Sequence, residues 1–159
     1  MLDEQRKFKA DTRNVIDIAL LSICITLFGL VSTLKPEMIA TNPLFILQLV
    51  LAVPLFMCGL LVRIKEVAYS DSLRWTKLGA GTFLLAYGFF INSIGLLLAF
   101  TTATYISMVF FAVNTLLTLI RAGIVVSYNS SKLRSRIFRE IVQFAIVLFL
   151  GILPALGIY

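Results

Sequence analysis

The feature that most constrains this chain is a long stretch without charge, since no Asp, Glu, Lys or Arg occurs between Lys77 and Arg121. A membrane-spanning helix needs about 20 apolar residues, because each residue rises about 1.5 Å and the hydrocarbon core is about 30 Å thick. The stretch is roughly twice that length, so it must fold back on itself. The weakly polar run at 101–104 is the predicted turn between two antiparallel helices.

Composition extends the membrane interpretation to the rest of the chain. The 159 residues are 60% hydrophobic and 14% charged, with a mean hydropathy of +0.99. Soluble domains are about 45–50% apolar and about 25% charged, and a chain this short cannot bury such an excess in a core. We therefore predict an all-α, polytopic integral membrane protein with a single transmembrane domain and no soluble domain. The five predicted spans of this compact bundle are residues 15–34, 44–62, 78–100, 104–127 and 141–158.

The basic residues predict how these spans are oriented. With five spans, every Lys and Arg except Lys35 falls on one side of the membrane, at the amino terminus or near the second and fourth links. Lys and Arg are enriched in cytoplasmic loops, so we expect a cytoplasmic amino terminus and a carboxyl terminus outside. Merging or removing any one span would put basic loops on both sides. The expected location is a multi-pass membrane protein, in the cell membrane if the source is prokaryotic.

Small residues form a stripe along the third predicted span. Gly81, Gly88 and Gly95 are spaced by seven, and Ala99 extends the same face. Helices in lipid associate through close backbone approach and polar contacts, because burial against lipid gives no hydrophobic gain. The stripe therefore predicts a helix-packing seam, with the fourth span as its partner.

Polar side chains follow the same two spans. If the turn centres near residue 103, Asn92 and Asn114 lie at the same depth in an antiparallel hairpin. Two interpretations fit this pattern: a hydrogen-bonded packing contact, or a polar-lined passage or pocket. The polar residues of this face are Asn92, Ser93, Ser107, Asn114, Thr115 and Thr118.

Three charged residues lie near the cytoplasmic ends of the predicted spans: Asp17, Arg121 and Glu140. Charge in a bilayer is costly, and it commonly marks a functional site. One interpretation is a titratable site in which Asp17 or Glu140 binds a proton or a cation beside Arg121. The other is an interfacial ion pair that docks helices, with Arg121 extending to the headgroups.

The sequence lacks the residues of most soluble enzyme chemistry. It contains no His, no nucleotide-binding glycine loop and no metal-ligand cluster, so we expect no metal, no cofactor and no catalytic residues. We expect a small channel or carrier for an ion or small solute that works as a homo-oligomer. The alternative is a non-catalytic membrane subunit, an assembly factor, or an immunity or regulatory protein that binds partner helices through small-residue seams.

The expected partners follow from the same features. The lipid bilayer surrounds the spans, and the basic inner loops of a chain with net charge +6 can attract anionic lipid headgroups. Partner membrane proteins would meet the small-residue seams. No feature indicates binding to nucleic acid.

Overall fold

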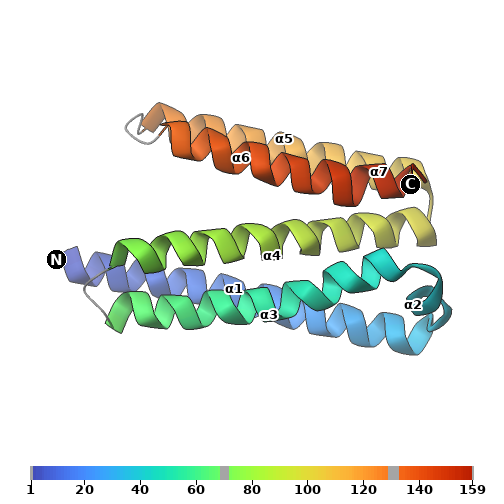
Figure 1. The fold of residues 1–159 in the computed structure, drawn as a ribbon, viewed down its shortest axis with the longest axis horizontal. Coiled ribbons are helices and arrows are strands. Elements are labelled where there is room, and N and C mark those ends of the chain that lie inside the picture. Colours follow the sequence, from blue (N-terminus) through green and yellow to red (C-terminus); the bar gives the residue numbers. More distant parts are fainter. Residues whose placement is uncertain (1, 69–71, 129–132, 159) are drawn as a thin grey trace. The chain divides into compact units, whose positions relative to one another are not determined.

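Every element in the described residues of the computed structural model is a helix (Figure 1). The structure describes residues 2–68, 72–128 and 133–158. In chain order, the elements are α1 (Leu2–Leu34), α2 (Glu37–Thr41), α3 (Pro43–Ala68), α4 (Ser72–Thr101), α5 (Thr104–Tyr128), α6 (Leu133–Val147), the π-helical segment η2 (Leu148–Ile152) and α7 (Leu153–Ala155).

The prediction of five membrane-length helices is confirmed by length and composition. The helical segments long and apolar enough to cross a membrane are Asp11–Leu34, Pro43–Lys65, Arg74–Thr101, Thr104–Ile124 and Ile137–Ala155. The predicted fold-back after the third span is also present, as a short break between α4 and α5. The last span differs from one regular helix, because α6, η2 and α7 build it in succession.

The chain divides into two compact units. The first unit is Met1–Phe90 and the second is Ile91–Tyr159. The division falls within α4, so this helix gives its first part to the first unit and residues 91–101 to the second.

The first unit is organised by the pairing of α1 with α3. On α1, buried Asp17, Cys24 and Val31 are seven residues apart. On α3, six of the buried positions are spaced alternately by four and three residues. This spacing keeps one stripe of each helix against the other, as in a left-handed helix pair. The α3 residues in this stripe are Phe45, Leu49, Ala52, Phe56, Gly59 and Arg63.

The core of the second unit is built around the ring of Phe111. This ring on α5 is almost completely buried, and it lies against two glycines. A Cβ added at Gly95 would stand 2.6 Å from Cε2 of Phe111, and one added at Gly151 would stand 2.9 Å from Cε1. Both glycines are therefore needed for the close approach of their helices to the ring.

The π-helical turn of η2 lies directly before Pro154. Proline has no N–H, and in a regular α-helix its ring clashes with the carbonyl four residues earlier. A wider π turn relieves this clash within a continuous helical segment. It also places Gly151 where Phe111 approaches it.

The glycine seam predicted from the sequence is not uniform. Gly88 and Gly95 are buried, and Ala99 is half-buried. Gly81 is exposed, and no described atom lies within 4 Å of a Cβ built there. Close packing at the expected partner helix, α5, is thus shown at Gly95.

Candidate functional site

A small recess with a mainly apolar lining and a few polar groups lies between α5 and α6 in the second unit. Its volume is about 30 Å³, close to the space of one water molecule. Residues three or four apart share one face of a helix, so each helix contributes a single stripe to the lining. The lining residues are Asn114, Thr115, Thr118 and Leu119 of α5 and Glu140, Gln143, Phe144 and Val147 of α6.

The polar lining of the recess has one carboxylate. The Oε2 atom of Glu140 is buried and has no hydrogen-bond partner among the described groups. Gln143, one turn further along α6, is also buried. On α5, the hydroxyl of Thr118 donates a hydrogen bond of 2.9 Å to the carbonyl of Asn114, which leaves its oxygen lone pairs able to accept or to coordinate.

Leu119, Phe144 and Val147 supply the apolar walls of the recess. An apolar lining lowers the local dielectric constant and strengthens the attraction between a carboxylate and any positive group that enters. The arrangement can therefore bind a small positively charged or hydrogen-bond-donating species.

Four of the residues singled out from the sequence meet at this recess: Asn114, Thr115, Thr118 and Glu140. Arg121 follows Thr118 by three residues on α5, and it is exposed rather than part of the lining. Gln143 was missed by sequence reasoning. Its position three residues after Glu140, within an otherwise apolar run, was the available signal.

The other polar residues of the predicted face hold helices together in the second unit. The amide nitrogen of Asn92 donates a hydrogen bond of 3.1 Å to the backbone carbonyl of Ile146 in α6. The hydroxyl of Ser107 on α5 donates a hydrogen bond of 2.7 Å to the carbonyl of Gly95 on α4. Ser93 is buried. The bond from Asn92 goes to α6, whereas Asn114 lines the recess.

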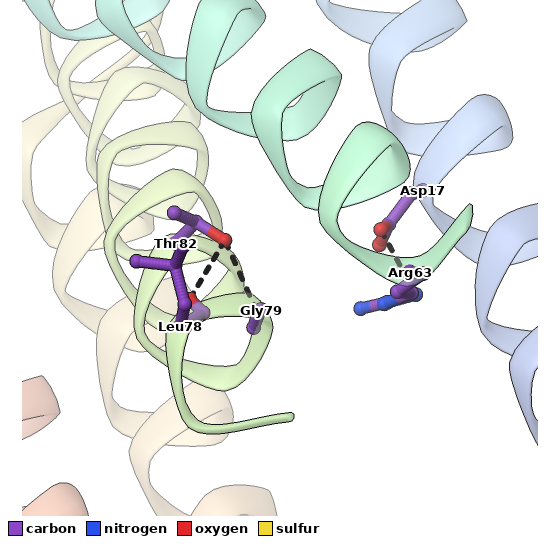
Figure 2. A network of polar contacts seen from close by, with 5 residues as sticks. All are labelled: Asp17, Arg63, Leu78, Gly79 and Thr82. Atoms are coloured by element: carbon purple, nitrogen blue, oxygen red, sulfur yellow. Dashed lines mark hydrogen bonds and ion pairs between the residues drawn. The ribbon is translucent and has the colours of Figure 1, made fainter. Parts of the chain in front are cut away.

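A buried ion pair joins α1 to α3 in the first unit. The guanidinium Nη1 of Arg63 lies 2.9 Å from Oδ2 of Asp17, and both side chains are almost completely buried (Figure 2). Gly59 makes room for the carboxylate, because a Cβ there would stand 3.3 Å from Asp17 Oδ2. The guanidinium carbon of Arg63 also lies 5.6 Å from the centre of the Phe83 ring, a cation–π distance.

Figure 2 also draws Thr82 of α4, and no dashed line joins it to the ion pair. Its hydroxyl donates to the carbonyls of Leu78 and Gly79, each at 3.1 Å, within its own helix. The ion pair of Asp17 and Arg63, by contrast, crosses between two helices. Its two opposite charges compensate each other, so it suits helix docking better than the binding of a free ion.

The structure thus gives Asp17 a partner that the sequence did not indicate. Asp17 and Arg63 belong to the first unit, whereas Arg121 and Glu140 belong to the second. Arg63 was counted as a loop charge because it ends an apolar block. Its spacing of four from Gly59 and seven from Phe56 is the signal that would have placed it on the inward stripe of α3.

Within the described residues, no group of three or more His, Cys, Asp or Glu side chains is placed to hold a metal ion. Cys24 and Cys58 are free thiols in the first unit. Comparison of the chain with protein families, with curated proteins and with solved structures finds no match. The fold defines a helical chain with five helices suited to crossing a membrane.

Proposed function

We propose that this chain is a small multi-pass membrane channel or carrier for an ion or small solute, with the recess between α5 and α6 as its binding site. The observation that carries the proposal is the buried, unpartnered Oε2 of Glu140 in a recess lined by hydroxyl and amide groups. A charged group within an apolar span costs several kcal/mol unless it is paired or solvated. A bound species that supplies the missing partner would offset that cost.

The proposed orientation follows the basic residues, with the amino terminus in the cytoplasm and the carboxyl terminus outside. One contact in the first unit fits a position of the second link at the level of the lipid headgroups. The ammonium group of Lys65 lies 5.9 Å from the ring centre of Trp75, and both residues belong to the basic link proposed to face the cytoplasm. Amphipathic rings and Lys side chains favour the headgroup zone, where anionic lipids would be the partners.

We further propose a homo-oligomer, because five helices are too few to enclose a wide water-filled pore by themselves. Large apolar side chains are exposed along α5, including Leu116, Leu117 and Ile120. These side chains can face lipid or a second copy of the chain. The native mass of the protein in a mild detergent distinguishes the two.

The test of transport is flux through liposomes that contain the purified protein. Glu140→Gln keeps the shape of the side chain and removes its charge. A hydrogen bond to a charged group is worth about 1.5–3 kcal/mol, so we expect flux at limiting solute to fall by about tenfold or more. Glu37→Gln is the matched control, because Glu37 is exposed at the start of α2 in the first unit. Equal flux in wild type, Glu140→Gln and Glu37→Gln would refute the proposal.

A second candidate function is a non-catalytic membrane subunit that binds partner helices. It is favoured by the use of Asn92, Ser107 and Gly95 in helix packing rather than in the recess. Under this proposal, mild-detergent extraction yields a complex with a different membrane protein, and the purified chain alone gives no flux. A homogeneous species that contains only this chain would count against it.

A further inference from the structure

We infer that the recess between α5 and α6 binds a small monovalent cation that has lost most of its hydration shell. The inference rests on the proposed function for the claim that this cation is the transported species. Its evidence is the size, the charge and the ligand atoms of the recess.

Size restricts the occupant first. A recess of about 30 Å³ accommodates one water molecule or an ion of similar size. Pockets for organic ligands are about 300–1,000 Å³. A sugar, an amino acid or a hydrated ion with a complete water shell is therefore too large, and a bare or partly hydrated alkali cation fits.

The charge of the lining restricts the occupant of the recess further. Glu140 is the single acidic residue among the described lining residues, and no Lys or Arg is among them. One carboxylate balances one positive charge and repels anions. Ca²⁺ takes six to eight oxygen ligands, commonly from several carboxylates, and Mg²⁺ keeps several waters in an octahedral shell. The recess has neither the charge nor the space for either ion.

The oxygen atoms of the lining also favour an alkali cation. Several polar groups of the lining can offer oxygen: the carboxylate of Glu140, the hydroxyls of Thr115 and Thr118, and the side-chain carbonyl of Gln143. Oxygen ligands suit hard cations, whereas copper, zinc and iron favour imidazole or thiolate. The sequence has no His, and both cysteines belong to the first unit.

The test is the thermal stability of the detergent-solubilised protein in NaCl, KCl or N-methylglucamine chloride at equal ionic strength and fixed pH. N-methylglucamine is monovalent and too large for the recess. We expect a saturable rise in the midpoint of unfolding with Na⁺ or K⁺ and none with N-methylglucamine, since a ligand that binds only the folded state stabilises it. Equal midpoints in all three salts would overturn the inference, and so would a saturable rise that appears only when CaCl₂ is tested at the same ionic strength.

Two variants test whether the stabilising cation binds at the recess. Glu140→Gln is expected to weaken the apparent cation affinity by about tenfold or more, and Thr115→Val, which removes one ligand oxygen and keeps the charge, by a smaller factor. Glu37→Gln is expected to leave the affinity unchanged. If Glu140→Gln does not fold, Thr115→Val decides the question. Full cation stabilisation in both recess variants would overturn the assignment of the site.

Liposome flux separates this inference from the proposed function. Cation binding at the recess without flux of any ion refutes transport and supports the cation site. Flux of a neutral solute without cation stabilisation supports transport and overturns the cation. Cation-selective flux that Glu140→Gln abolishes supports both.

Discussion

The sharpest structural prediction compares two glycines on one helix. Gly81 and Gly95 both lie on α4, and the sequence places them on the same predicted seam. In the structure, a Cβ at Gly95 collides with the Phe111 ring, whereas a Cβ at Gly81 meets no described atom within 4 Å. The same change, Gly to Ala, should therefore have opposite effects at the two positions.

The magnitude follows from the distances. Carbon atoms in contact are about 3.5–4.0 Å apart, so the 2.6 Å separation from Cε2 of Phe111 alone requires a displacement of about 1 Å, and Cζ of the same ring lies closer still. The Phe111 ring cannot easily supply it, because Gly151 confines the ring as well. Overpacking of this kind costs about 1–3 kcal/mol. Gly81→Ala gains helix propensity of up to about 1 kcal/mol. We expect the free energies of unfolding of the two variants to differ by about 1–4 kcal/mol.

The assay is reversible unfolding in mixed micelles with increasing SDS, followed by far-ultraviolet circular dichroism. Gly95→Ala should shift the transition to less SDS, and Gly81→Ala should leave it unchanged or shift it to more. Phe111→Leu in the Gly95→Ala background should recover part of the loss, because it shortens the group that collides. A Gly95→Ala variant as stable as Gly81→Ala would refute the packing of the second unit described above.

Two further predictions concern the ion pair and the orientation. Asp17→Asn removes the carboxylate that is paired with the buried charge of Arg63, and it should lower the free energy of unfolding by about 3–5 kcal/mol. The double variant with Arg63→Gln should lose less than the sum of the two single losses in the same SDS titration, and additive losses would show that the pair does not couple α1 to α3. A cysteine added at the carboxyl end of the chain should react with an impermeant maleimide in intact cells, whereas one added at the amino end should not. Labelling of both ends from outside would contradict five spans with a cytoplasmic amino terminus.

The helices could be predicted from the sequence because their signal is local. Each span is a run of about 20 apolar residues, and the uncharged stretch after Lys77 forces one fold-back. The interruption of the last span was not predictable in the same way. Pro154 indicates an irregularity in this span, but a proline does not by itself predict a π turn at Leu148–Ile152 or the close approach of Phe111 to Gly151 within it.

The candidate site could be predicted only in part. Polarity within apolar runs singled out Asn114 and Glu140, and the structure brings them to one recess. Their meeting depends on how α5 packs against α6, and helix pairing in lipid follows shape rather than hydrophobic periodicity. Arg63 was missed for a related reason. A charge at the end of an apolar block resembles a loop charge until the partner helix presents Asp17 to it.

Reaction with silver ions shows whether the recess between α5 and α6 admits a small cation. Ag⁺ is a small monovalent cation that reacts with thiolates. In a protein with both native cysteines replaced by Ala, Thr115→Cys places a thiol in the recess, and Leu116→Cys places one on the exposed apolar side of the same helix. We expect Ag⁺ to react about tenfold faster or more at Thr115→Cys in liposomes, since a thiolate forms only where polar groups or water solvate it. We also expect K⁺ to slow the reaction of Ag⁺ with the Thr115→Cys variant and to leave its reaction with the Leu116→Cys variant unchanged. Equal rates at the two positions, with no effect of K⁺, would contradict the account.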